Sequence, residues 1–205
     1  MDWAFQDRLE RIQKLPTLPL VIRKLDEAVQ DPDSDVSKIT GIIQDDPAIM
    51  ARILKVANSV FYTTHKRITD LRTAVVVMGL RAVHNIALST AVFSTFPPSK
   101  GTKMDRAAFW RHSIYTAVAT EVLSAHSAAG DGSSHRRDEL HLAGLMHDIG
   151  KIVLEQFFHG EFTRALELSR REEIPLYRAE ERILGANHTQ VGAWLGDKWN
   201  LAPEI

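Results

Sequence analysis

Apolar residues recur at the spacing of an α-helix along almost the whole chain, and no segment alternates apolar and polar residues between two turns. Val36, Ile39 and Ile43, for example, fall at positions i, i+3 and i+7, which places them on one helical face. Residues 47–57 are apolar nearly all round, which is typical of a helix at the centre of a core. The pattern predicts an all-α fold.

The clearest break in this pattern lies at residues 97–103, where two prolines are followed by small polar and basic residues. Proline removes a backbone donor and restricts the residue before it, so such a run is typical of a linker. We therefore expect helical subdomains at residues 1–103 and 104–205, which together form one continuous domain.

Composition narrows the class of partners. The formal net charge of the chain is -1, so the chain as a whole exerts no electrostatic attraction on nucleic acid. We expect no membrane partner, because neither a signal-peptide pattern nor a long uninterrupted apolar run occurs. The absence of cysteine excludes disulfides and thiolate metal ligands and favours a cytoplasmic location.

Residues 74–88 offer one argument for a nucleic-acid partner, because two short helical segments meet there at Gly79, as in a helix-turn-helix. The second segment presents only Arg81, His84 and Asn85 to a DNA groove. Packing in a core explains the apolar pattern better, so a nucleic-acid binder ranks third among the functions that we consider.

Two side chains able to bind a metal stand next to each other near the end of an apolar helical segment. Leu140, Ala143 and His147 fall at i, i+3 and i+7, so the imidazole continues an apolar stripe. Asp148 lies about 100° further round a helix, near enough to aim its carboxylate at the same point. We expect Gly150 to end this helix, leaving Lys151 to project a cation beside the pair.

Two further histidines continue apolar rows on other predicted helices. His112 shares a row with Tyr115 and Val122, and His188 shares one with Val191 and Leu195. Burying three imidazoles and a carboxylate without partners would cost roughly 1 to 3 kcal/mol per group. A shared divalent cation satisfies all four groups, and these ligand types suit Fe, Mn, Ni or Zn. The predicted metal ligands are His112, His147, Asp148 and His188.

The alternative without a metal stays open, since buried polar groups can also satisfy one another. His147 and Asp148 would then hydrogen-bond to each other, and His112 would bind a backbone carbonyl. Such histidines are common in protein cores.

His112 followed by His147 and Asp148, in a Gly-Leu-Met-His-Asp-Ile-Gly-Lys context, resembles the first three ligands of the HD superfamily of metal-dependent phosphohydrolases. Further motifs resemble, in order, those of the HDOD domain, an output domain related to that superfamily. They are residues 15–19, 45–59 and 74–80, followed by Glu181, Gly185, His188, Val191, Gly192 and Trp199.

This resemblance implies a multi-helix, HD-like bundle preceded by an amino-terminal helical subdomain. It also implies a regulatory module in signal transduction, coupled to a signalling protein partner. HDOD domains are generally regarded as having lost hydrolase activity, so the metal site would be partial or degenerate.

The second hypothesis is a metal-dependent phosphohydrolase that acts on a phosphoester or a cyclic dinucleotide. A bound cation would lower the pKa of a water molecule and polarise a phosphoryl oxygen. Lys151 would contact the phosphate of a nucleotide or other phosphoester ligand.

Two departures from the family pattern weaken the hydrolase hypothesis. The hydrolases complete their site with an aspartate well beyond the last histidine, whereas Asp197 falls about 180° round the helix from His188. The paired histidines and Gly-Tyr-Pro motif of the HD-GYP enzymes also have no counterpart. The chain stops at Ile205, where a domain of this type would continue, which suggests truncation of a longer natural protein.

Overall fold

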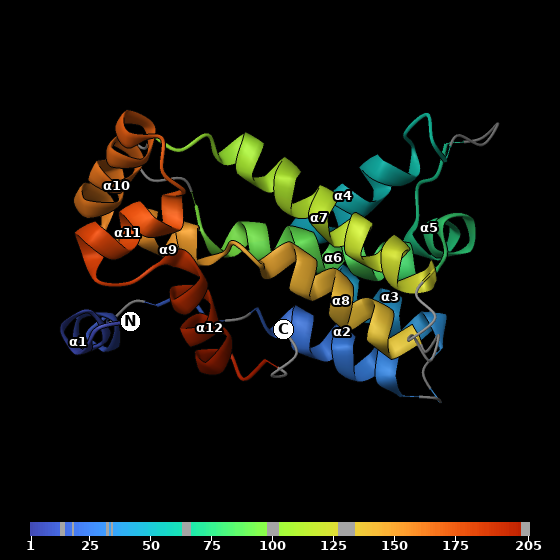
Figure 1. The fold of residues 1–205 in the computed structure, drawn as a ribbon. Helices are drawn as coiled ribbons and strands as arrows, with labels where there is room; N and C mark the ends of the chain where they lie inside the picture. Colours follow the sequence, from blue (N-terminus) through green and yellow to red (C-terminus); the bar gives the residue numbers. More distant parts are fainter. Residues whose placement is uncertain are drawn as a thin grey trace. The chain divides into compact units, whose positions relative to one another are not determined.

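The computed structural model describes residues 1–12, 15–17, 19–31, 33, 35–62, 67–97, 103–126 and 134–201. Within these ranges the regular structure is entirely α-helical, with no strand, which confirms the predicted all-α class (Figure 1). Backbone contacts divide the chain into two compact units. One comprises Met1–Pro16 together with Phe96–Ile205, and the other comprises Thr17–Thr95.

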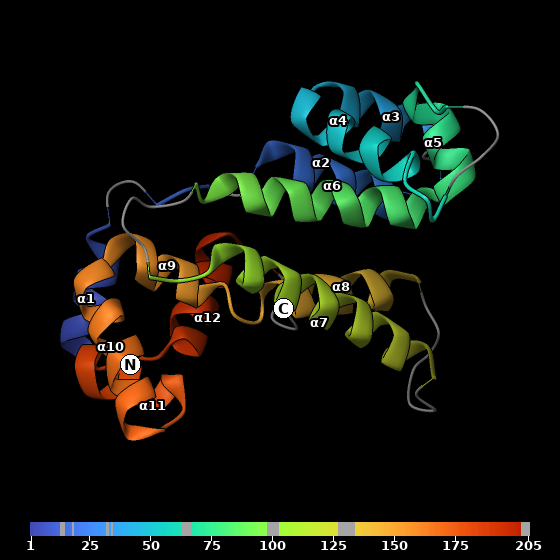
Figure 2. The ribbon, with the colours of Figure 1, turned by 90° about the horizontal axis from the view of Figure 1, so that it is seen from above.

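The Thr17–Thr95 unit is built around one long helix, α6, which contacts α2, α4 and α5 (Figure 2). Its core consists of aliphatic side chains such as Ile39, Ile53 and Val83, all fully buried. The helices are α2 (Leu20–Gln30), α3 (Val36–Gln44), α4 (Pro47–Ala57), α5 (Leu71–Met78) and α6 (Leu80–Thr95).

Aspartates determine where three of these helices begin. The carboxylates of Asp35, Asp46 and Asp70 accept hydrogen bonds from first-turn backbone N–H groups of α3, α4 and α5. The break between α5 and α6 falls at Gly79, whose φ of 82° favours glycine. His84, one of the three residues suggested for a DNA groove, is buried in α6, so a core role explains it better.

The other unit contains the remaining helices, and α7 and α8 form a closely packed pair within it, side by side (Figure 2). A Cβ on Gly144 would lie only 2.7 Å from the Cα of Ala117, so these two backbones approach closely. The helices are α1 (Trp3–Glu10), α7 (Arg106–His126), α8 (Ser134–Met146), α9 (Gly150–Phe157), α10 (His159–Glu172), α11 (Leu176–Leu184) and α12 (His188–Lys198).

The amino-terminal helix α1 packs with the carboxy-terminal helices. The ring of Phe5 lies 4.7 Å from that of Phe158, and the Asp2 backbone N–H donates to the carbonyl of Gly185 at 2.9 Å. Glu10 accepts hydrogen bonds from Trp194 and Lys198 on α12. The boundaries of the two units therefore differ from the expected ranges 1–103 and 104–205, because helix α1 packs against helices that lie far away in the sequence.

The row of α7 that contains His112 does not face a core, contrary to the sequence prediction. Tyr115 is 69% exposed and Val122 is 50% exposed. Helix α7 instead buries the opposite side, with Phe109, Ser113 and Ala117, and small residues there allow close approach to α8. Both sides of α7 carry apolar residues, so periodicity alone did not identify the buried one.

Of the described helices, none is by itself long and apolar enough to cross a membrane. Helices α5 and α6 reach that length and hydrophobicity only when they are taken together, and a bend of 115° separates them.

Gly150 does not end a helix, contrary to the sequence prediction. Helix α8 already ends at Met146, residues 147–149 form a turn, and Gly150 is the first residue of α9. A Cβ at Gly150 would lie 1.9 Å from the carbonyl oxygen of His188. The glycine is therefore required by the contact of α9 with the beginning of α12.

We predict that Gly150→Ala lowers the free energy of unfolding by roughly 3 kcal/mol, because the added methyl group overlaps backbone atoms that cannot move away cheaply. Urea denaturation measures this change. The matched control is Gly160→Ala, since a Cβ there meets no atom within 4 Å. Equal stability of the two variants would contradict the close contact between α9 and α12.

Candidate metal centre

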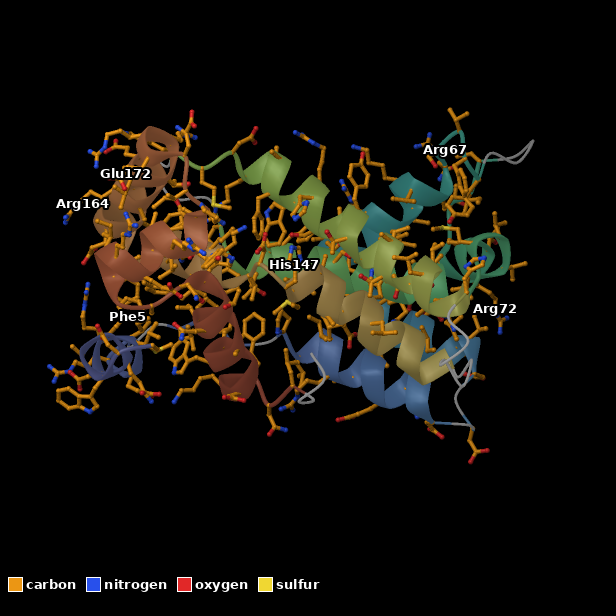
Figure 3. All side chains as sticks on the ribbon, in the orientation of Figure 1. Phe5, Arg67, Arg72, His147, Arg164 and Glu172 are labelled. Carbon is orange, nitrogen blue, oxygen red and sulfur yellow. The ribbon has the colours of Figure 1, made fainter. Side chains whose placement is uncertain are left out.

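Three of the four predicted ligands lie in a single cluster in the unit Met1–Pro16 plus Phe96–Ile205. His147 and Asp148 belong to the turn between α8 and α9, and His112 lies on α7. Figure 3 marks His147 at the end of α8. The close packing of α7 on α8 through Gly144 brings His112 to this turn.

The side-chain atoms of the cluster are spaced as ligands of one ion would be. The Nε2 atoms of His112 and His147 are 3.1 Å apart. Asp148 Oδ2 lies 3.2 Å from His147 Nε2 and 3.7 Å from His112 Nε2. All three ligand atoms therefore lie within 4.8 Å of one another, which is compatible with metal–ligand bonds of about 2.0–2.2 Å.

The hydrogen bond of the Nδ1 atom of His147 determines where this ring carries its proton. Nδ1 lies 2.8 Å from the carbonyl oxygen of Gly144, which can only accept a hydrogen bond, so Nδ1 carries the proton. In the neutral ring the Nε2 lone pair then points at His112 and Asp148. Two acceptors would meet there unless a proton or a cation lies between them. Metal-binding histidines in proteins are held in this way.

His188 contacts the same carboxylate from the other side. Its Nε2 atom lies 3.3 Å from Asp148 Oδ1, whereas His112 and His147 lie nearest Oδ2. His188 Nδ1 and its backbone N–H both donate to Glu180 Oε2, at 2.5 and 2.8 Å. The row of His188, Val191 and Leu195 is buried, as the sequence predicted.

Lys151 lies directly beside Asp148. Its Nζ is 2.6 Å from Asp148 Oδ2, so the ammonium group forms an ion pair with the carboxylate of the cluster. Lys151 is half-buried, and Asp148 is buried. Four nitrogen atoms, from Lys151 and three imidazoles, therefore lie within 3.7 Å of one carboxylate.

These contacts shift the pKa values of the cluster. Burial raises the pKa of the Asp148 carboxyl, but hydrogen bonds from His147, His188 and Lys151 outweigh it and hold that pKa far below its usual range. The hydrogen bond to Asp148 raises the pKa of His147. Burial lowers the pKa of His188, but Asp148 and Glu180 together raise it above its ordinary value. The site therefore favours positive charge around Asp148.

The cluster is open on the side of α7. The His112 side chain is 59% exposed, and His147 is partly exposed. His112 is therefore not an inward-facing residue, contrary to the sequence prediction, because α7 buries its opposite side. An ion held here would keep coordination positions that a ligand from solution can reach.

Glu180 is the residue of this site that the sequence analysis missed. It is fully buried on α11, whereas its neighbour Glu181, which the family resemblance identified, is exposed and binds the side chain of Asn187. The signal was present, because Glu180 lies in the apolar row of Leu176 and Leu184 at helical spacing.

The cap of helix α12 sets the position of His188. Asn187 accepts a hydrogen bond from the backbone N–H of Gln190, and the Gln190 side chain accepts one from the backbone N–H of Asn187. This capping box makes His188 the first residue of the helix.

The HDOD domain model matches residues 15–205 of the chain. An HDOD domain protein of unknown function from Geobacter sulfurreducens is similar in structure, with 26% identity and a TM-score of 0.80, over 97% of this chain and 64% of that one. A candidate signal transduction protein from Marinobacter aquaeolei VT8 is 25% identical, with a TM-score of 0.79, over 97% of this chain and 48% of that one.

A third solved structure is that of a candidate metal-dependent phosphohydrolase from Shewanella amazonensis SB2B. It is 26% identical, with a TM-score of 0.63, and the match covers 98% of this chain and 69% of that one. The chain thus spans about half to two thirds of the length of these relatives.

We predict that Asn187→Ala lowers the free energy of unfolding by about 1 to 2 kcal/mol, because it leaves first-turn N–H groups of α12 without an acceptor. Chemical denaturation measures the loss. Asn187→Ser is the matched variant and should recover most of the stability, since a hydroxyl oxygen can also cap a helix. If the serine variant is as unstable as the alanine variant, the cap does not hold α12.

Proposed function

Because the chain belongs to the HDOD domain family, we propose that it is a signal-transduction module whose His–Asp cluster holds one divalent cation without catalysing hydrolysis. The family and a signal-transduction relative at 25% identity support the regulatory part of this proposal. The cation-binding part is supported by the donor atoms of the cluster.

The observation that carries the proposal is the convergence of the ligand atoms of His112, His147 and Asp148, together with the direction of the His147 lone pair. The Gly144 carbonyl takes the Nδ1 proton of His147, so its Nε2 lone pair faces His112 and Asp148. Without a cation, His147 satisfies the same contacts only as an imidazolium that donates from Nδ1 to Gly144 and from Nε2 to Asp148. A divalent cation would accept these lone pairs together, and its charge would compensate the carboxylate.

The donor set indicates which cations fit. Imidazole nitrogen and carboxylate oxygen suit Fe, Mn, Ni and Zn. With three protein ligands, such an ion could also bind an oxygen of a phosphoester or nucleotide. When bound, the ion would supply Lewis acidity. The Lys151 ammonium group, next to Asp148, would add a second positive charge for a phosphate.

We propose that the site does not catalyse hydrolysis because of the acidic side chains that it lacks. In the described part of the chain, the cluster contains one carboxylate, Asp148, and no second acid that could position an attacking water. Asp197, the nearest acid to His188 on α12, is exposed. We infer that ligand binding, rather than a reaction, is what a signalling protein partner would sense.

A metal-dependent phosphohydrolase is the second candidate. Lys151 beside an open His–Asp cluster favours it, and so does the similarity to the Shewanella amazonensis protein at 26% identity. Measuring metal content and turnover on the same preparations separates the two candidates.

We expect about one divalent ion per chain in protein purified without an affinity tag, and almost none in His147→Ala or Asp148→Ala. Inductively coupled plasma mass spectrometry gives the ion content. His126→Ala is the matched control, because His126 is exposed at the end of α7 and, among the described residues, hydrogen-bonds the Val122 carbonyl alone. A chain that holds no ion, or a His147→Ala variant that keeps it, would refute the cation site.

We further expect no turnover of bis(4-nitrophenyl) phosphate or cyclic dinucleotides in the presence of Mn²⁺ or Fe²⁺. Inorganic phosphate should bind to the metal-loaded protein in calorimetry, and Lys151→Met should weaken it about tenfold through loss of a charge-assisted hydrogen bond. Turnover that disappears in Asp148→Ala would replace the regulatory proposal by the hydrolase.

A further inference from the structure

The chain that follows α4 makes a tight turn that exposes two large apolar side chains. The backbone N–H of Tyr62 donates to the carbonyl of Ser59 at 3.1 Å, which places Val60 and Phe61 at the two central positions of a turn. Val60 is 95% exposed and Phe61 is 85% exposed. Such positions normally carry glycine, proline or small polar residues. The turn itself therefore does not explain a valine followed by a phenylalanine.

The side chain of Asn58 fixes this turn to its unit. Its amide nitrogen donates to the carbonyl oxygens of Leu54 and Ile68, both at 2.7 Å, and its oxygen accepts from the backbone N–H of Ile68 at 2.9 Å. Because Ile68 is buried, the two ends of the loop between α4 and α5 are held together on the core. Arg67, at the second end, therefore lies near the beginning of the turn.

Basic residues dominate the part of the unit that contains this turn. Residues 47–95 contain six lysines and arginines and a single acid, Asp70. Three of the basic residues are exposed and form no ion pair with a described residue, namely Arg52, Lys55 and Arg67. Their charges are therefore available to a partner.

Acids dominate the preceding part of the same unit. Residues 26–46 contain seven aspartates and glutamates and one basic residue, Lys38. Asp33, in the connection between α2 and α3, is exposed and also forms no ion pair with any described residue. The unit therefore has an acidic region and a basic region that are separate in the sequence.

The two regions meet where α3 and α5 begin. Arg72, in the first turn of α5, donates a hydrogen bond to Ser37 Oγ in the first turn of α3, at 3.2 Å. Asp33 comes shortly before α3, and Arg67 comes shortly before α5. Figure 3 shows Arg67 and Arg72 at the same end of this unit. That end therefore carries an acidic patch and a basic patch next to each other, together with the exposed apolar turn.

The arrangement of the two signs indicates the kind of partner. A nucleic acid or an anionic bilayer would be attracted by the basic patch but repelled by the acidic patch beside it. A surface with adjacent patches of opposite charge is instead complementary to itself, because a two-fold rotation brings each patch of one copy onto the opposite patch of the other. Exposed aromatic and aliphatic side chains beside arginine are also typical of protein–protein interfaces.

We propose that this end of the unit is the contact surface of a homodimer, in which a second copy of the chain docks about a two-fold axis. The acidic patch of each copy, with Asp33, faces the basic patch of the other, with Arg67. Val60 and Phe61 are buried between the two copies, which explains an apolar turn that one copy alone leaves in water. The dimer goes beyond the proposed function and does not depend on the cation.

Sedimentation velocity of the whole chain, from about 1 to 200 µM, measures the association. We expect a dimer at 50 mM NaCl, and roughly tenfold weaker association at 500 mM NaCl, because salt screens the charged patches. Phe61→Ser should weaken association about tenfold or more through loss of apolar burial. Trp3→Ser is the matched control, since Trp3 is also an exposed aromatic residue, at 81%, but belongs to the other unit. It should leave the dimer unchanged.

Charge reversal tests the two-fold arrangement. Arg67→Glu and Asp33→Lys should each abolish self-association, because each variant brings like charges together at both ends of the interface. An equimolar mixture of the two variants should form a heterodimer, since Lys at position 33 of one copy then meets Glu at position 67 of the other, and the second contact keeps the original Asp33 and Arg67. This rescue also shows that both variants are folded.

Three results would overturn the proposal. They are a chain that stays monomeric at 200 µM and 50 mM NaCl, a dimer that Phe61→Ser leaves unchanged, and a mixture of the charge-reversal variants that does not associate. Pelleting of a monomeric chain with vesicles that contain phosphatidylserine, if Arg67→Glu abolishes it, would assign this end to a membrane surface instead. Binding of duplex DNA with the same sensitivity would assign it to nucleic acid.

Discussion

The carboxylate of Asp148 is the interaction on which the rest of the site depends. Imidazoles from α7, from the turn after α8 and from α12 converge on it, together with the ammonium group of Lys151. Their positive character keeps a buried carboxylate ionised, and the carboxylate in turn gives each of these nitrogens a partner. Three helices that are distant in sequence are thus held to one point by charge as well as by apolar packing.

That convergence requires backbones to approach more closely than side chains normally allow. Gly144 lets α8 approach Ala117 on α7, and Gly150 lets α9 meet the carbonyl of His188. The apolar residues of the unit supply most of the burial, but these two glycines determine where the polar atoms lie. The close packing of the backbones around the cluster therefore determines where its polar atoms lie.

The helical period predicted the all-α class, because it depends only on local spacing. The row of His188, Val191 and Leu195 was also identified correctly, since only one side of that helix is apolar. The side on which His112 lies was not, because α7 is apolar on two sides and burial depends on which one meets α8. Glu180 escaped notice because a glutamate in an apolar row is usually exposed, and only its contact with His188 explains its burial.

The docking of α1 has a consequence for how the chain is made. Arg8 on this helix pairs with Glu161, and Trp194 on α12 reaches back to Glu10. Helix α1 therefore cannot pack until α10 and α12 have been synthesised, while Thr17–Thr95 can already bury its own core. Closing so long a loop costs little more free energy than closing a shorter one, but it delays completion of the unit that carries Asp148 until α12 has been synthesised.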